Sequence, residues 1–160
     1  MTSQPDPYII QYAVAQAGKS PCQKSKRGVC IFNLEQGVII SSGFNSPSKG
    51  AGSCTGTETC RKNCSRVCVH AEQAALLQAM SYGCRITGLD MMHIKVVGGQ
   101  PVEGGPPSCS DCSKLILASG IRFMWLLETG RGWVRYSAKE FHMETLRNCG
   151  LLEKHGPESV

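Results

Sequence analysis

A histidine and a glutamate, His70 and Glu72, stand two residues apart at the start of an apolar, helix-favouring run, VCVHAEQAALLQAM (67–80). Further along the chain, Cys109 and Cys112 form a Cys-x-x-Cys pair at the start of a second helical pattern. Free backbone N–H groups and the helix dipole at such a start favour the thiolate form of cysteine. One imidazole and two thiolates bind zinc and leave a fourth tetrahedral position for water. The sequence therefore predicts a catalytic zinc site.

Glu72 is suited to carry protons at this site. A carboxylate two residues beyond a ligand histidine can lie next to the bound water without binding the metal. Because two thiolates weaken the pull of the zinc on water, a neighbouring base gains importance. We therefore predict that Glu72 is the catalytic acid and base. The other histidines, His93, His142 and His155, have no partner motif and are predicted to be ordinary core residues.

The ten cysteines of the 160-residue chain favour metal binding over disulfides. Several of them lie two or three residues apart, and the N-terminal MTSQPDPYII lacks the order of a secretion signal. No stretch approaches the roughly 18 apolar residues of a membrane span. We expect a cytoplasmic protein with no membrane partner. Cysteines outside the proposed metal sites are predicted to be small core residues: Cys30, Cys68, Cys84 and Cys149.

The positive charge of the chain is concentrated in its first half. The net charge is +5, and between Lys19 and Arg66 eight basic residues stand against two acidic ones. Such a stretch is either a solvated face or a surface that attracts a phosphate of a nucleotide or a nucleic acid. Lys26 and Arg27, which precede the first expected strand, either reach a substrate phosphate or belong to a solvated loop.

The elements that must position these residues follow from periodicity and turn signals. The expected order is α-β-β-α-β-α-β-α, which predicts a single domain over residues 1–160, with helices on both faces of a sheet. The segment 45–66 is rich in Gly, Ser and Cys and poor in apolar residues, so burial alone cannot hold it. The segment 98–107 is expected to be a loop. The expected helices begin near residues 8, 69, 108 and 137, and the expected strands near 29, 37, 91 and 121.

The two motifs together resemble the zinc-dependent cytidine and deoxycytidylate deaminase superfamily. Its signature is H-x-E followed by P-C-x-x-C, and the chain carries HAE (70–72) and PPSCSDC (106–112). The element order from residue 8 to 150 resembles that fold as well. The resemblance implies a three-layer α/β/α cytidine deaminase-like fold with a mixed central sheet. It also implies hydrolytic deamination of a cytosine ring, with Glu72 as the proton shuttle.

Within the superfamily, the chain is closest to phage-type deoxycytidylate (dCMP) deaminases. GFNSP (43–47) resembles their G-Y-N-G-x-P turn, and by position Asn45 inherits the role of hydrogen-bonding the nucleotide sugar. The predicted substrate-binding residues are Asn45, Arg27 and Ala71. The implied reaction converts dCMP to dUMP and releases ammonia.

The resemblance to phage-type members also implies a second, structural zinc. Their second site takes one cysteine after the first helix, one in the loop after the hairpin, and two ligands four residues apart. Here those offsets fall on Cys22, Cys54, Cys60 and Cys64. Independently, Cys60 and Cys64 share one face of a helical turn, and four thiolates would hold the coreless segment. Cys68, another four residues on, is an alternative to Cys22 or Cys54.

Two departures leave the substrate open. Ser108 stands directly before Cys109, where the family has proline, and the loop from Gly98 to Ser108 resembles that of free cytidine deaminases. The alternatives are therefore a nucleoside or base deaminase and a nucleic-acid deaminase. The chain lacks the long aromatic and basic arms that would hold a strand, which disfavours the latter. A third alternative is not an enzyme: it is a non-catalytic zinc module that binds nucleic acid. Superfamily members assemble, so the resemblance also implies a homo-oligomer.

Overall fold

The structure, a computed structural model, describes residues 4–152. Its centre is a six-stranded sheet with the strand order β2-β1-β5-β7-β8, to which β6 adds by pairing with β5. β5 and β7 are parallel, and the other pairings are antiparallel, so the sheet is mixed, as predicted. The strands of this sheet are β1 (Lys26–Asn33), β2 (Val38–Phe44), β5 (Asp90–Val97), β6 (Gln100–Val102), β7 (Phe123–Glu128) and β8 (Gly132–Ser137).

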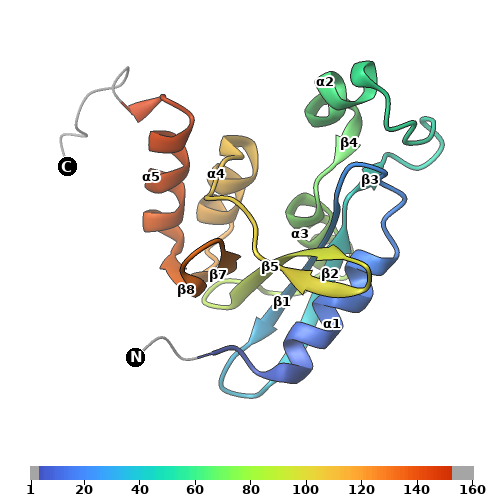
Figure 1. Cartoon of the computed structure of the whole chain (residues 1–160). Helices are drawn as coiled ribbons and strands as arrows, with labels where there is room; N and C mark the ends of the chain where they lie inside the picture. The colour runs from blue at the N-terminus through green and yellow to red at the C-terminus, as the bar shows by residue number, and fades with distance from the viewer. Residues whose placement is uncertain (1–3, 153–160) are drawn as a thin grey trace.

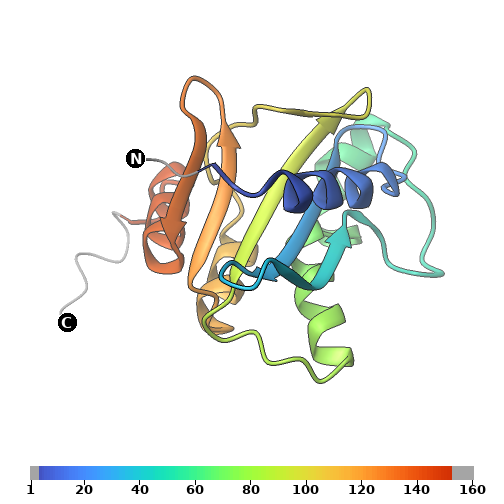
Figure 2. The same ribbon diagram turned by 90° about the horizontal axis from the view of Figure 1, so that it is seen from below.

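Helices cover both faces of the sheet. α1 (Pro7–Gly18) lies on one face, and α3 (Ala71–Ser81), α4 (Ser110–Ala118) and α5 (Ala138–Asn148) lie on the other (Figures 1 and 2). Each face has its own apolar core, because side chains alternate along the strands. Met91 and Met124 face α3 and α4, whereas Met92 and Trp125 face α1. The molecule thus has the three α/β/α layers that the sequence predicts.

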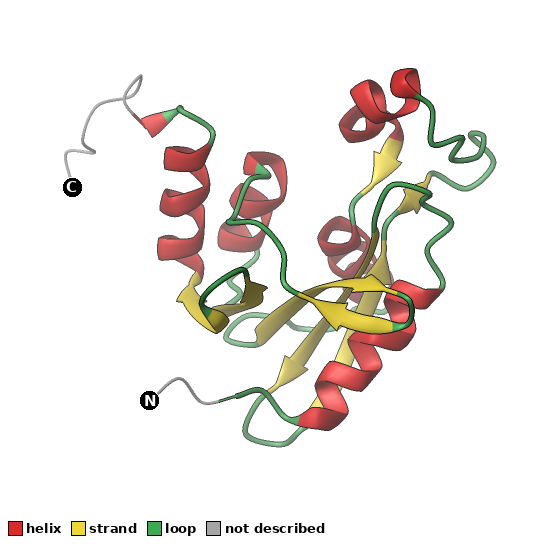
Figure 3. Ribbon diagram, in the orientation of Figure 1, coloured by secondary structure: helices red, strands yellow, loops and turns green. Residues whose placement is uncertain are grey.

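A second, smaller unit stands apart from the central sheet. It consists of α2 (Glu58–Val67) and a two-stranded ladder of β3 (Ser46–Pro47) and β4 (Cys68–Val69). Figure 3 shows that the segment between β3 and α2, residues 48–57, carries neither helix nor strand. α2 has no buried residue. The low apolar content of this segment therefore corresponds to a real lack of core, as the sequence indicates.

Two glycines allow helices to approach the sheet closely. A Cβ on Gly28 of β1 would lie 2.1 Å from the carbonyl oxygen of Ala13 in α1. A Cβ on Gly43 of β2 would lie 2.5 Å from the backbone nitrogen of Ala75 and 2.6 Å from the carbonyl oxygen of Ala71, both in α3. Real Cβ contacts with backbone atoms are never this short, so only glycine fits. Gly43 therefore sets how closely the first turn of α3 sits on β2.

A buried carboxylate ties the parallel strands together. Asp90, at the start of β5, is fully buried. It accepts hydrogen bonds from Arg122 Nε at 3.2 Å and from Trp125 Nε1 at 2.9 Å. The Arg122 side chain remains 41% exposed, so that the guanidinium keeps contact with water while it neutralises the buried charge. This network joins the N-terminal end of β5 to β7.

Several sequence expectations need correction. Residues 98–107 are not all loop, because β6 forms a hairpin with β5, and a further strand, β8, follows the fourth expected strand. Lys26 and Arg27 begin β1 rather than precede it. Cys30 is buried as predicted, whereas Cys149 is exposed and Cys68 and Cys84 are half-buried. His155 lies outside the described residues. Within residues 4–152, none of the helices has the length and apolar character needed to cross a bilayer.

Candidate active site

His70 lies at the entrance to α3 rather than inside it. It occupies the N-cap position in an extended conformation, and its backbone N–H donates to Oε1 of Gln73 at 3.0 Å. The carbonyl oxygen of His70 accepts the first helical hydrogen bond, from Ala74 at 2.9 Å. These contacts hold the backbone at the helix start. The imidazole is thereby directed away from the helix and into a cavity beside it.

Cys109 occupies the corresponding position of α4. It is the N-cap residue, and its sulfur accepts the backbone N–H of Cys112 at 3.4 Å. Cys112 lies in the first turn and is buried. A helix N-terminus presents unpaired N–H groups and a positive dipole end to both sulfurs. The thiolate form of Cys109, the N-cap residue, is therefore favoured.

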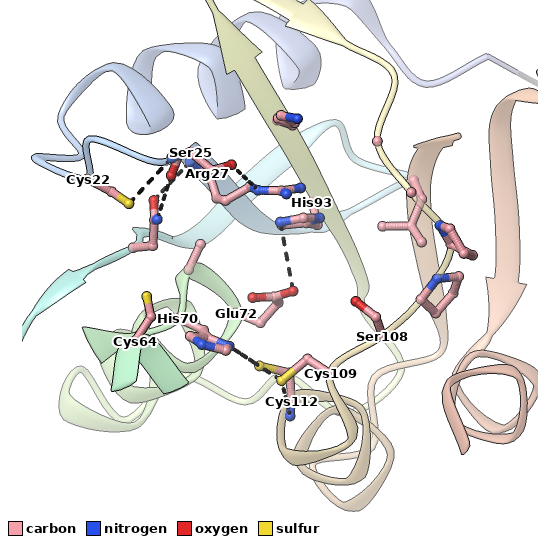
Figure 4. A pocket seen from close by; sticks show the side chains of 18 of the residues that line it. Cys22, Ser25, Arg27, Cys64, His70, Glu72, His93, Ser108, Cys109 and Cys112 are labelled. Carbon is pink, nitrogen blue, oxygen red and sulfur yellow. Dashed lines mark hydrogen bonds and ion pairs between the residues drawn. The ribbon is translucent and has the colours of Figure 1, made fainter. Parts of the chain in front are cut away.

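The two helix starts bring three ligand atoms together. His70 Nδ1 is 3.2 Å from Cys112 Sγ and 3.4 Å from Cys109 Sγ, and all three atoms lie within 4.8 Å of one another. Figure 4 shows the imidazole and the two sulfurs pointing toward a common point. One nitrogen and two sulfurs at this separation suit a tetrahedral zinc with one position left open. The residues therefore fit the metal that the sequence predicts.

The acid–base properties of the three groups are linked. The hydrogen bond with Cys112 lowers the pKa of Cys109 to about 5, and the ring of His70 acts in the same direction. The shared hydrogen bond and burial raise the pKa of Cys112. The hydrogen bond to Cys109 raises the pKa of His70. The thiols thus share a proton, which a bound cation would displace, because metal ligands must be deprotonated.

Glu72, the second residue of α3, points into the same cavity without joining the three ligand atoms. Its side chain is 12% exposed. In Figure 4 the carboxylate lies between the His70–Cys109–Cys112 group and His93, with its Oε1 3.9 Å from His93 Nε2. A carboxylate next to a metal site and largely shielded from water is placed to exchange protons there. The position agrees with the role predicted for Glu72.

The cavity has a volume of about 380 Å³ and a basic side. Lys24, Arg27 and Lys95 line it together with the residues described above. Arg27 and Lys95 are direct cross-strand neighbours on β1 and β5. Like charges in this position repel each other, and burial lowers the pKa of Arg27. The arrangement therefore favours an anion between these side chains.

The opposite wall of the cavity is the segment 104–108. Gly104 is fixed to β7, because its N–H donates to the carbonyl oxygen of Leu127 at 2.9 Å. The carbonyl oxygen of Pro107 accepts from Asn148 Nδ2 of α5, also at 2.9 Å. The proline that the family places directly before the first cysteine is Pro107 here, one residue earlier. Despite this shift, the segment holds Cys109 at the start of α4.

Asn45 and Ala71, the other residues predicted to bind substrate, both line the cavity. Asn45 also supports the backbone. Its Oδ1 accepts the backbone N–H of Arg27 at 2.8 Å, and its Nδ2 donates to the carbonyl oxygen of Ser25 at 2.8 Å. The side chain thus holds the segment that leads into β1. One N–H of the amide and one lone pair of its oxygen remain for a ligand. Ala71, buried at the first position of α3, contributes backbone to the cavity floor.

The cysteines predicted for a second zinc gather around α2 but do not all meet. Cys54 Sγ and Cys60 Sγ are 3.8 Å apart. Cys22 Sγ accepts the N–H of Ser25 at 3.4 Å. Cys64 lines the main cavity as well as a second one of about 260 Å³ next to α2. Within residues 4–152, only the His70 group brings three ligand atoms within 4.8 Å of one another.

Cys68 lies among these cysteines, and its pKa bears on the second site. It follows α2 and lines both cavities with Cys64. Burial raises the pKa of Cys68 to about 12, and the hydrogen bond with Cys64 acts in the same direction. Backbone hydrogen bonds from Thr55 and Gly56 lower the pKa of Cys60. Cys60 therefore loses its proton more readily than Cys68, although both lie near the proposed second zinc site.

His93 is a cavity residue that the sequence analysis assigned to the core. The sequence gives a partial signal for this position, because residues 91, 93 and 95 lie on one face of β5. On that face the buried Met91 is followed by His93 and then by the polar Lys95. The sequence could not show that β5 runs next to the start of α3, which depends on long-range pairing. Of the other predicted core histidines, His142 is half-buried between α5 and α4, where its Nδ1 is 2.8 Å from Ser113 Oγ.

Comparison with known families adds an independent finding. A family model for the cytidine and deoxycytidylate deaminase zinc-binding region matches residues 3–128. The match includes His70, Glu72, Cys109 and Cys112. No curated protein sequence matches the chain.

Solved structures of deaminases share the fold. A dCMP deaminase from the cyanophage S-TIM5, in complex with dCMP and dUMP, is 25% identical, with a TM-score of 0.58 over 76% of this chain and 82% of its own. The apo form of that enzyme gives 23% identity and a TM-score of 0.55 over 73% and 77%. A cytidine deaminase from Burkholderia pseudomallei is 18% identical, with a TM-score of 0.56 over 86% and 96%. The chain thus shares its fold with these deaminases.

Proposed function

Because the chain belongs to the cytidine and deoxycytidylate deaminase family, we propose that it hydrolyses the amino group of a cytosine nucleotide, with dCMP as the substrate. The products are dUMP and ammonia. The observation that carries the proposal is the convergence of His70, Cys109 and Cys112 next to the carboxylate of Glu72. We further propose that residues 1–160 form one deaminase domain, since the helices of both layers pack on one sheet.

His70, Cys109 and Cys112 are the proposed ligands of the catalytic zinc. When bound, zinc supplies the Lewis acidity that makes water a nucleophile near neutral pH. Glu72 accepts one proton from the attacking water and passes it to the ring nitrogen. It then accepts the hydroxyl proton of the adduct and passes it to the departing amino group. The low exposure of Glu72 limits proton exchange with bulk solvent during these transfers. Water adds at the ring carbon, the carbon–nitrogen bond breaks, and ammonia leaves.

The preference for a nucleotide rests on the basic side of the cavity. Arg27 is anchored by a hydrogen bond from its Nε to Ser25 Oγ at 2.7 Å, which leaves the terminal guanidinium nitrogens for a ligand. Lys95 lies across from it on β5. A phosphate between these cations would relieve their repulsion. Asn45, next to the same segment, has one N–H and one lone pair left for the sugar.

The test is a substrate panel with metal content measured on the same sample. We expect ammonia release from dCMP to exceed release from cytidine, deoxycytidine, cytosine and guanine. Short single-stranded DNA that contains cytosine is included, since the basic first half of the chain also suits a nucleic acid. Activity on deoxycytidine with none on dCMP would contradict the nucleotide proposal. A zinc-loaded protein with no activity on any cytosine compound would contradict the deaminase proposal itself.

We also propose a second, structural zinc held by Cys22, Cys54, Cys60 and Cys64. Supporting observations are the 3.8 Å separation of the Cys54 and Cys60 sulfurs and the lack of a core around α2. Metal binding would supply the free energy that burial does not supply there. We expect about two zinc ions per chain in the wild-type protein, as one catalytic and one structural site require.

Serine variants separate the alternatives for this second site. Cys60→Ser should lower the zinc content by one ion while the ammonia-releasing site keeps its metal. Cys22→Ser and Cys68→Ser form a matched pair, because each removes one thiol from the same region. Loss of one zinc in Cys68→Ser but not in Cys22→Ser would replace Cys22 by Cys68 in the ligand set. One zinc per chain in the wild-type protein would contradict the second site.

A further inference from the structure

His93 is a polar residue in an otherwise apolar place. On β5 it shares a face with Met91, which lies in the core, and with Lys95, which lines the cavity. Its cross-strand neighbours are Val29 on β1 and Leu126 on β7. Aliphatic neighbours on both sides offer no hydrogen bond to an imidazole, and a largely buried ring requires a polar partner. The cavity must supply that partner.

The partner that the structure provides is Glu72. His93 Nε2 and Glu72 Oε1 are 3.9 Å apart, and their side chains are 17% and 12% exposed. This separation exceeds a direct hydrogen bond, but a bridging water or a small rotation closes it. Hydrogen bonds in active sites are commonly longer before substrate binds. In Figure 4, His93 approaches the carboxylate from the side opposite the His70–Cys109–Cys112 group.

The charge state of His93 determines what it can do for the carboxylate. Burial lowers the pKa of His93, although the Glu72 carboxylate opposes the shift. The ring is therefore neutral near pH 7 and donates through one N–H. Arg27 interacts electrostatically with both His93 and Glu72. A neutral imidazole N–H orients the carboxylate of Glu72 by hydrogen bonding, without forming an ion pair with it.

We propose that His93 is a positioning residue that holds one carboxylate oxygen of Glu72 through Nε2–H and turns the other oxygen toward the metal ligands. The inference rests on the deaminase function proposed above. It assigns to His93 a role in the rate of reaction rather than in zinc binding or in substrate affinity.

Three variants of His93 test this role. His93→Leu removes the donor, His93→Gln places an amide N–H near the position of Nε2, and His93→Asn reaches only the position of Nδ1. We expect His93→Leu to lower kcat by about 10- to 100-fold, the usual effect of losing a residue that supports an active-site group. KM for dCMP and zinc content should stay near the wild-type values. His93→Gln should restore most of kcat, whereas His93→Asn should resemble His93→Leu.

These outcomes distinguish positioning from packing. A purely structural role would let His93→Leu keep full activity, or would lower the activity of the leucine and glutamine variants equally. Either result would overturn the inference. A rise in KM at unchanged kcat would also overturn it, because the residue would then act on substrate binding. Wild-type protein that releases no ammonia would instead show that the proposed function is wrong.

The contact itself can be measured without turnover. In ¹⁵N-labelled, zinc-loaded protein, the ring signals of His93 are identified by their loss in His93→Gln. We expect the Nε2-protonated form in the wild-type protein and a shift of these signals in Glu72→Gln. Glu140→Gln is the matched control, since Glu140 caps α5 through Ser137 outside the cavity. His93 signals that are the same in wild type and Glu72→Gln would contradict the contact.

Discussion

Glu72 is the residue whose removal separates metal binding from chemistry. It faces the cavity beside the ligand atoms but is not one of them. We expect Glu72→Gln to keep the full zinc content and to lower kcat by at least the 10²- to 10⁴-fold attributed to general acid–base catalysis. Zinc analysis and ammonia release on one preparation check this. A Glu72→Gln protein with wild-type turnover would instead favour the non-catalytic zinc module.

Cys109 should behave differently, because it is both a ligand and the cap of α4. Cys109→Ser removes a thiolate of low pKa and replaces it with a hydroxyl that binds zinc poorly at neutral pH. We expect loss of one zinc and loss of deamination together. Ser is a good N-cap, so α4 should still begin at the same place. Cys149→Ser, at an exposed cysteine of the same chain, is the control and should retain both zinc and activity.

The metal ligands of the site could be predicted from the sequence, whereas the contacts of the residues around them could not. His70, Cys109 and Cys112 were recognisable because helix starts and a two-residue spacing are local features. Asn45 was assigned to the sugar by its place in a turn, but its hydrogen bonds to Arg27 and Ser25 depend on the pairing of β1 and β2. His93 was missed for the same reason. Its partner is distant in sequence and meets it through the packing of α3 on β2 and β1, the latter of which pairs with β5.

At the level of elements, the approach of α3 to β2 is expected to be the most sensitive contact. Gly43→Ala would place a methyl group 2.5 Å from the backbone of Ala75 and 2.6 Å from that of Ala71. The helix must shift, and overpacking of this kind costs about 1–3 kcal/mol of unfolding free energy. Since Ala71 lies between His70 and Glu72, we also expect a lower kcat. Urea unfolding at fixed zinc concentration and dCMP turnover measure the two effects.

Gly18→Ala is the matched control for this helix contact. Gly18 ends α1, and a Cβ there meets nothing within 4 Å. Its stability should remain within about 0.5 kcal/mol of wild type, as for surface substitutions generally. Equal losses in Gly18→Ala and Gly43→Ala would mean that the close approach of α3 is unimportant.

The expected order lacks five elements of the structure: β3, α2, β4, β6 and β8. Two of them, the strands β6 and β8 of the central sheet, share a physical property. β6 contains a proline and only three residues, and β8 follows a glycine-rich turn and carries an arginine among its aromatic residues. Both lack the long run of apolar or alternating residues by which strands are recognised. They form because the C-terminal end of β5, beyond its pairing with β7, and the outer edge of β7 are free to pair. These two strands therefore form through tertiary pairing with their neighbours and not through a local sequence pattern.

For the molecule as a whole, Asp90 is the main polar element of the core. It is fully buried and is held by Arg122 and Trp125. Asp90→Ala would leave the indole N–H without its acceptor, and breaking such a buried charge network costs about 3–5 kcal/mol. We expect a large loss in urea midpoint with little change in KM for dCMP, because Asp90 does not line the cavity. A midpoint within experimental error of wild type would contradict this.

Assembly and location remain predictions. The resemblance implies a homo-oligomer, and light scattering of the zinc-loaded chain measures its mass directly. The expectation of a cytoplasmic protein is tested by fractionation of the cells that make it.

The wall formed by residues 104–108 is fastened at two separate points, to β7 through Gly104 and to α5 through Pro107. Because it is held by hydrogen bonds at both points, this segment cannot move away to open the cavity. Lys24 and Lys95 line the same cavity, so their ammonium groups attract an anion that enters it. An anionic substrate would therefore be captured faster in dilute salt than in concentrated salt, while an uncharged nucleoside would be indifferent to the change.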